Sequence, residues 1–145
     1  MFKTLFFKSP HIHASKCLSL YFDVDDIRDW HVKGNKWSDC GYHYVITLDG
    51  KIQEGRPVEK QGAHVAGMNK HSIGICYIGG MDKNMDLWLD TRTPEQKDSL
   101  FNLLMDLKFQ YPEAVVYGHN DFTDKKVCPC FDAFKEYREI SNYTE

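Results

Sequence analysis

The run Ser72-Ile73-Gly74-Ile75-Cys76-Tyr77-Ile78 constrains the fold of this chain more than any other segment. It is almost entirely apolar and is closed by the pair Gly79-Gly80. A strand with one face in water alternates apolar and polar residues, whereas a strand covered on both faces is a continuous apolar run. We therefore expect residues 72–78 to form a buried strand in the middle of a sheet.

Strand and helix signals alternate around this run. Residues 42–47 are rich in aromatic and β-branched side chains, and Asp49-Gly50 then turns the chain into residues 51–54, which predicts a hairpin. Further short strands are expected over residues 3–7, 10–14 and 114–119. The alternation predicts an α/β domain with a mixed central β-sheet flanked by helices.

Two helices have clear start signals. Asp23 can cap a helix from Val24 to about Lys33. Thr93 caps a second helix, with Pro94 in its first turn and Gln96 completing a capping box, and this helix should run to about Gln110. Its core-facing stripe is Leu100, Leu103, Leu104 and Leu107. Residues 81–92 are expected to be a surface loop, and a short terminal helix is expected to carry Phe131, Phe134 and Tyr137.

Length and charge limit the class of protein. With 145 residues, 42% of them hydrophobic, the chain has the size of one compact domain, expected over residues 1–145. Its 18 Lys and Arg against 21 Asp and Glu give a net charge of -3, which makes nucleic acid an unexpected partner. No apolar run reaches the roughly 20 residues of a membrane span. The stretch Leu5-Phe6-Phe7 is shorter than the about 7 to 15 residues of a secretory signal core, so we expect a cytoplasmic protein as synthesised.

Five cysteines, an odd number, argue against a fully paired disulfide framework and are typical of a reducing compartment. Cys17, Cys40 and Cys76 are expected to be small buried hydrophobic residues. Cys128 differs because it follows Asp124-Lys125-Lys126, where a neighbouring ammonium favours the thiolate form that binds metal. Cys130 is the competing thiolate.

Two histidines and Cys128 are placed as a metal site would require. His13 lies near the end of an early predicted strand, His119 closes a late one, and Cys128 follows in the next loop, so strand ends would bring them to one sheet edge. Two imidazoles and one thiolate leave the fourth zinc position open, as catalytic sites do. A single histidine is more often a satisfied polar residue, so the combination is what favours a zinc hydrolase.

An ordered series of short motifs resembles a known family. The motifs are Ile12-His13-Ala14-Ser15, Asp26 to His31, Gly41-Tyr42-His43-Tyr44, Asp49-Gly50, Glu54-Gly55-Arg56, Gly62-Ala63-His64 with Asn69, Ser72 to Ile75, Gly118-His119-Asn120-Asp121 and Lys126-Val127-Cys128-Pro129. In this order they resemble the zinc-dependent N-acetylmuramoyl-L-alanine amidases, the family of the phage amidase-type lysozymes and the peptidoglycan-recognition proteins. The resemblance covers residues 9–137.

This resemblance implies a peptidoglycan-recognition-protein/amidase-like fold and a set of residue roles. It implies that His13, His119 and Cys128 bind Zn²⁺, with Cys128 rather than Cys130 as the thiolate because it precedes the proline. It also implies that Tyr42 and Lys126 assist catalysis. An ammonium or a phenol aimed at the amide oxygen would stabilise the negative charge that develops there. Lys125 stays an alternative to Lys126, and a solvated surface lysine is the simpler interpretation of either.

The other histidines have weaker assignments. Strand alternation would put Tyr42 and Tyr44 on one face and His43 on the other, where His43 would be structural. His64, in the Gly-rich loop 62–67, resembles a groove-lining histidine and is expected to contact substrate, with a loop-bracing hydrogen bond as the alternative. The surface or bracing histidines are expected to be His11, His31 and His71.

The sequence therefore predicts an enzyme that cleaves the amide between N-acetylmuramic acid and the L-alanine of the stem peptide. Its substrate would be peptidoglycan or a muropeptide, it would be a monomer, and it would act on the cell wall after release or on recycled wall fragments. One alternative is a non-catalytic peptidoglycan receptor, which retention of Cys128 disfavours, because that branch of the family replaces the cysteine. The other is a structural zinc protein, for which Cys130 is the nearby candidate for a fourth ligand.

Overall fold

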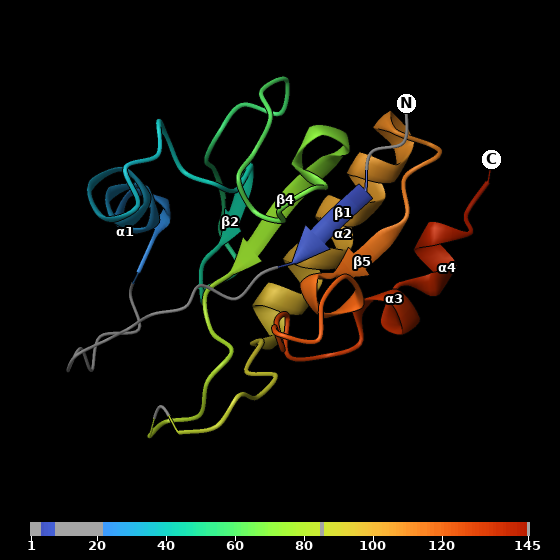
Figure 1. Ribbon diagram of the computed structural model, residues 1–145. Helices are drawn as coiled ribbons and strands as arrows, with labels where there is room; N and C mark the ends of the chain where they lie inside the picture. Colours follow the sequence, from blue (N-terminus) through green and yellow to red (C-terminus); the bar gives the residue numbers. More distant parts are fainter. Residues whose placement is uncertain (1–3, 8–21, 85, 145) are drawn as a thin grey trace.

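The computed structural model describes residues 4–7, 22–84 and 86–144, and it contains one mixed β-sheet. The sheet has the strand order β3-β2-β4-β1-β5 (Figure 1). Its strands are β1 (Thr4–Phe7), β2 (Tyr44–Ile46), β3 (Ile52–Glu54), β4 (Ser72–Tyr77) and β5 (Val116–Gly118). Only β2 and β3 pair in antiparallel fashion, and the other neighbours are parallel. The predicted mixed sheet is confirmed, whereas the strand expected over residues 10–14 lies outside the described residues.

The central strand β4 is buried along its whole length, as its composition predicts. It pairs with β2 on one side and β1 on the other. Its side chains divide between two apolar clusters. Ile73, Ile75 and Tyr77 pack in the larger cluster with the leucines of α2 (Pro94–Gln110), while Cys76 packs in a smaller cluster with Ile27 of α1 (Val24–Asp29). Both faces of the strand are therefore covered.

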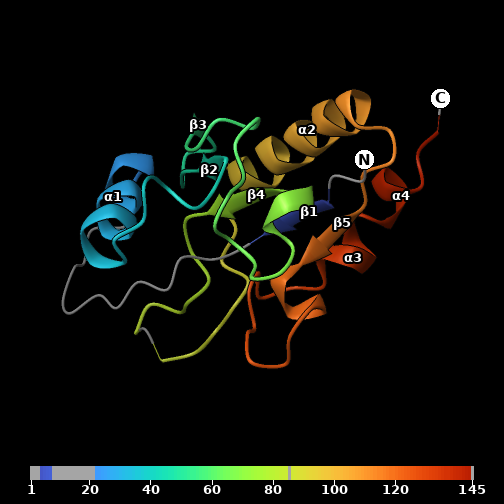
Figure 2. The ribbon, with the colours of Figure 1, turned by 45° about the horizontal axis from the view of Figure 1, so that its top comes forward.

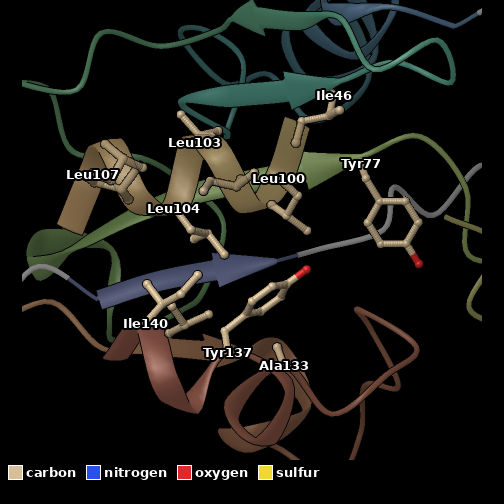
Figure 3. Packing of buried hydrophobic residues seen from close by; sticks show 12 residues of the cluster. Ile46, Tyr77, Leu100, Leu103, Leu104, Leu107, Ala133, Tyr137 and Ile140 are labelled. Carbon is tan, nitrogen blue, oxygen red and sulfur yellow. The ribbon is translucent and has the colours of Figure 1, made fainter. Parts of the chain in front are cut away.

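Helix α2 lies across one face of the sheet (Figure 2). The predicted capping box is present, since Gln96 N donates to Thr93 Oγ1 at 3.1 Å and Thr93 N donates to Gln96 Oε1 at 3.0 Å. Gln96 also donates through Nε2 to the carbonyls of Ile46 and Ile78. The cap therefore attaches the helix to β2 and to the end of β4. Its four predicted core leucines converge with Tyr137 and Ile140 (Figure 3).

Helix α1 begins as predicted, with Asp23 accepting from the main-chain N–H groups of Asp25 and Asp26. It continues in a π-helical turn, η1 (Trp30–Gly34). Two 3-10 turns, η2 (Asn69–His71) and η3 (His119–Asp121), precede β4 and follow β5. Within the part of the chain that the structure describes, no helix is both long and apolar enough to cross a membrane.

The C-terminal region differs from the expectation of a single terminal helix. Two four-residue helices form instead, α3 (Ala133–Glu136) and α4 (Arg138–Ser141), because Tyr137 leaves helical geometry between them. Tyr137 is buried, whereas Phe134 is 42% exposed. The predicted loop 81–92 contains an isolated β-bridge between Met81 and Trp88.

Arg92 lies at the end of that loop and is buried, although the loop was predicted to lie on the surface. The side chain of Arg92 is 1% exposed, and its guanidinium donates to Asp90, to Glu136 and to the hydroxyl of Tyr137. Its Cζ lies 3.3 Å from the ring centroid of Phe131. All five N–H donors are used, so the guanidinium ties the end of the loop to α3.

Replacing Arg92 with Met should lower the free energy of unfolding by about 3 kcal/mol, because two carboxylates then face each other without their cation. Burial alone would raise the pKa of Asp90, but the hydrogen bond and charge of Arg92 outweigh it and lower that pKa. A lowered carboxyl pKa adds stability above the pKa of the unfolded chain, and this stability is lost as the pH falls. The deficit of Arg92→Met in urea unfolding should therefore be largest at neutral pH and shrink below about pH 4.

Lys33→Met is the control for this measurement. Its ion pair with Asp29 is exposed on both sides, so its removal should change the unfolding free energy by about 0.5 kcal/mol or less. Equal deficits in the two variants would contradict a buried anchoring role for Arg92.

Candidate functional site

The candidate site begins where the edge strand β5 ends. β5 stops at Gly118, and His119 opens η3 at the carboxyl end of the parallel strands. The chain then runs out through residues 122–127 and returns, so that Asn120 N donates to the carbonyl of Cys128 at 2.9 Å. This return places Cys128 Sγ 3.6 Å from His119 Nδ1. Both residues are buried, at 1% and 8% exposure.

This separation lies within the range of a sulfur–nitrogen hydrogen bond, and it is also compatible with two ligands of one tetrahedral zinc ion. With Zn–S near 2.3 Å, Zn–N near 2.05 Å and a tetrahedral angle, the two donor atoms stand about 3.6 Å apart. His13 lies outside the described residues, so its place relative to the pair is untested. Within residues 4–7, 22–84 and 86–144, no three side chains of His, Cys, Asp or Glu gather as a metal site.

The segment that carries Cys128 is held by a side chain of the central strand β4. Tyr77 on β4 donates its hydroxyl to the carbonyl of Pro129 at 2.7 Å. The ring of Tyr77 also contacts Phe131, on which the Arg92 guanidinium lies. Sequence reasoning missed this support. The available signal was a Tyr in an otherwise apolar buried run, since a buried phenol usually has a hydrogen-bond partner.

Cys130 points to a different neighbour. Its sulfur lies 3.4 Å from the carbonyl of Gly80, and burial, together with the nearby charges of Cys128 and Asp90, raises its pKa to about 11. A raised pKa disfavours the thiolate form. Cys40 and Cys76 are buried, as expected, and Cys17 lies outside the described residues.

Tyr42 is 2% exposed and packs in the smaller apolar cluster with Val45 and Cys76. The expectation that it shares a face with Tyr44 is wrong, because Tyr44 packs against the larger cluster instead. Alternation fails here because β2 begins only at Tyr44, so Tyr42 lies before the regular strand. Burial raises the pKa of Tyr42 well above its ordinary value, with smaller contributions from Cys76, Cys128 and Cys40.

The two candidate lysines differ in burial. Lys126 is half-buried two residues before Cys128, whereas Lys125 is exposed. The main-chain N–H of Lys125 donates to Thr123 Oγ1 at 3.2 Å. The choice between Lys126 and Lys125 as the catalytic lysine stays a prediction.

His43 has the structural role that the sequence suggests. Gly74 N donates to His43 Nδ1 at 2.9 Å, so this nitrogen is the acceptor and Nε2 carries the hydrogen that is donated to the carbonyl of Lys60. His31 is also a bracing residue, since its Nδ1 accepts from Gly41 N.

His64 is buried at 3% exposure, with Nε2 2.8 Å from Ser72 Oγ and Nδ1 3.3 Å from the carbonyl of Gly41. Its ring fills the space beside Gly62 and Gly74, where a Cβ on either glycine would meet it at 2.5 Å. These contacts match the loop-bracing alternative. Contact of His64 with substrate stays a prediction.

Fold and geometry together define an α/β domain with a histidine and a thiol paired at the carboxyl edge of its parallel strands. The family model described as N-acetylmuramoyl-L-alanine amidase matches residues 12–131. The chain therefore belongs to the N-acetylmuramoyl-L-alanine amidase family.

Relatives from phages and animals agree with this assignment. The endolysin of Klebsiella phage KP32 is 40% identical over 122 residues, which cover 84% of this chain and 78% of that protein. The endolysin of Escherichia phage T7 is 40% identical over 109 residues, 75% of this chain and 70% of that protein. Peptidoglycan-recognition protein SC2 of Drosophila melanogaster is 30% identical over 123 residues, 83% of this chain and 63% of that protein.

Solved structures confirm the expected fold. The endolysin N-acetylmuramoyl-L-alanine amidase LysCS of Clostridium intestinale has a TM-score of 0.76 at 26% identity, covering 98% of this chain and 84% of its own. Drosophila PGRP-LB has a TM-score of 0.73 at 27% identity, covering 97% of this chain and 81% of its own.

Gly118→Ala should destabilise the protein by about 1 to 3 kcal/mol through overpacking. A Cβ at residue 118 would meet Asn120 Oδ1 and would lie 2.6 Å from Pro129 Cδ, so the returning segment would have to shift. Gly34→Ala is the matched control, because a Cβ there meets nothing within 4 Å. Urea unfolding of both variants checks the prediction, and an unchanged midpoint for Gly118→Ala would contradict the close approach.

Proposed function

We propose that this protein is a zinc-dependent N-acetylmuramoyl-L-alanine amidase that hydrolyses the amide bond between N-acetylmuramic acid and L-alanine in peptidoglycan. The 3.6 Å separation of His119 Nδ1 and Cys128 Sγ carries the zinc part of the proposal, because it matches two ligands of one tetrahedral ion. Membership of the amidase family and 40% identity to phage endolysins support the reaction.

His119 and Cys128 would hold the ion, and His13 is the proposed third protein ligand. Zinc bound by three protein ligands would polarise the scissile carbonyl and lower the pKa of water to about 7. Cys128 is preferred to Cys130 as the thiolate because its sulfur faces His119, whereas the Cys130 sulfur faces Gly80.

Lys126 and Tyr42 are proposed to act on the substrate carbonyl. Attack on an amide places negative charge on its oxygen, and an ammonium or phenol that donates a hydrogen bond to this oxygen stabilises it. Lys126 lies on the same returning loop as Cys128, and the charge of Cys128 contributes to the raised pKa of Tyr42. These relations support a place for both residues near the proposed ion.

The substrate is proposed to be intact peptidoglycan or a soluble muropeptide, with His64 at the edge of its binding groove. The similarity to phage endolysins favours action on the cell wall after release from the cytoplasm. A monomer would suffice, because every proposed catalytic residue comes from one chain.

A non-catalytic peptidoglycan receptor is the second candidate, and the similarity to peptidoglycan-recognition proteins favours it. The paired His119 and Cys128 argue against it, since a receptor has no need for a thiol beside a histidine. Hydrolysis decides between the two candidates, because a receptor would bind muropeptides and release no product.

The purified protein, incubated with muropeptides, should release free stem peptide, and a chelator should abolish release until zinc is restored. Cys128→Ser should lose zinc and activity, because it removes a ligand. Cys130→Ser is the matched control two residues away and should retain both. Mass spectrometry measures the product and elemental analysis the metal. Release that persists after complete metal removal and in Cys128→Ser would contradict the proposal.

Lys126→Met should lower kcat by about 100- to 1000-fold, the loss that follows removal of one oxyanion donor. Lys125→Met is its neighbour-matched control and should stay within about twofold of the parent, because its side chain is exposed. Zinc content should be unchanged in both. If Lys125→Met is the slower variant, the roles of the two lysines are reversed.

A further inference from the structure

We propose that Arg56 is the positioning residue for Tyr42: its guanidinium holds the main chain that precedes Tyr42 and so sets the place of the phenol in the site. The proposal rests on the proposed function, because it takes Tyr42 as a catalytic residue. Arg56 itself touches no reacting group in this scheme. It acts through the backbone of residues 39–42.

The hairpin brings Arg56 to this place. Beyond the ends of β2 and β3 the two backbone segments continue to pair. Gly55 N donates to His43 O at 2.9 Å, and Arg56 N donates to Tyr42 O at 2.8 Å. Arg56 is therefore directly opposite Tyr42. Regular strand structure ends before this point, so the ladder alone does not fix the segment that leads into Tyr42.

The guanidinium of Arg56 holds the segment that leads into Tyr42. Nε donates to the carbonyl of Cys40 at 2.9 Å, Nη2 donates to that of Asp39 at 3.2 Å, and Nη1 donates to that of Gln61 at 2.7 Å. One planar group thus joins two consecutive carbonyls before Tyr42 to the loop that leads to His64. A lysine ammonium has no such fork of fixed donors and cannot reproduce this geometry.

The backbone segments around Tyr42 are in close contact, so they have little room to shift. A Cβ on Gly41 would lie 2.5 Å from the carbonyl of Ala63, and a Cβ on Gly55 would meet the carbonyl of Tyr42. Ala63 N also donates to Gly41 O at 3.0 Å. Because these segments touch at the main chain, a shift of residues 39–41 is passed directly to Tyr42.

Arg28 provides an internal comparison. It reaches the same loop, but it binds the carboxylate of Asp39 at 2.8 Å and that of Asp25 at 2.7 Å. Arg28 binds mainly these side chains and reaches one main-chain carbonyl, that of Gly55 at 3.5 Å, whereas Arg56 binds the main-chain carbonyls of Asp39 and Cys40. Loss of Arg28 should therefore leave the path into Tyr42 intact.

The test compares kcat for Arg56→Lys, Arg56→Gln and the matched control Arg28→Lys on a muropeptide. Displacement of a catalytic group by about 1 Å can cost about 100-fold in rate, so the Arg56 variants should lose about 10- to 100-fold in kcat. Their KM and zinc content should stay at the parent values. Arg28→Lys should remain within about twofold. Parent-like kcat in both Arg56 variants, or an equal loss in Arg28→Lys, would overturn the proposal.

A double-mutant cycle separates positioning from general damage to the fold. If Arg56 acts through the phenol, Arg56→Lys should cost nothing further in a Tyr42→Phe background, because the group it positions is gone. Multiplicative losses would overturn the proposal. For variants that fold poorly, Arg56→Ala is measured with added guanidinium ion, which should restore kcat when Tyr42 is present and fail to do so with Tyr42→Phe.

The outcomes also separate this inference from the proposed function. Unchanged kcat in Tyr42→Phe, with zinc-dependent hydrolysis intact, would overturn the role of Arg56 and leave the amidase assignment standing. Absence of zinc-dependent hydrolysis in the parent protein would overturn the proposed function itself, and the positioning role with it.

Discussion

The hydrogen bond from Asn120 N to the carbonyl of Cys128 is the contact on which the candidate site depends. It closes a loop whose two ends carry the histidine and the thiol, and the short turn η3 is the one regular element between them in this described segment. Closing such a loop costs conformational entropy, so its ends need independent support. β5 supports the first end, and the hydroxyl of Tyr77 on the central strand supports the second through Pro129. The positions of His119 and Cys128 therefore depend on the sheet, through one main-chain pairing and one hydrogen bond to a main-chain carbonyl.

The sequence predicted the parts of the fold that are decided locally. The apolar run of β4, the Asp49-Gly50 hairpin and the Thr93 capping box each lie within one short window, and all three are present. The buried role of Arg92 was missed because its ion partner Glu136 lies 44 residues away and the surrounding loop is polar. The break at Tyr137 was also missed, at a residue whose hydroxyl accepts from Arg92. Long-range polar contacts leave no period in a sequence.

The candidate site, too, was predicted from the sequence only in part. Residue chemistry and strand order singled out His119 and Cys128, and the structure brings these two together. Residue type alone left Cys130 open, because the direction of a sulfur depends on loop conformation. The face on which Tyr42 lies was predicted wrongly because period-2 alternation holds only inside a regular strand, and Tyr42 precedes β2. His64 shows the limit of motif reasoning, since a histidine in a Gly-rich loop can brace that loop with the same ring atoms that would meet a ligand.

The hydrogen-bond donors that hold these loops all use the same kind of acceptor. Arg56, Tyr77 and the main chain of Asn120 all donate to carbonyl oxygens rather than to side chains. Every residue supplies a carbonyl, so a substitution inside the loops removes no acceptor, whereas loss of a donor leaves buried acceptors unpaired. Apart from the glycines at close backbone contacts, substitutions should therefore cost most at the side-chain donors Arg56 and Tyr77. A site built in this way can change its loop side chains, and with them the surface presented to substrate, while the positions of the histidine, the thiol and the phenol stay fixed.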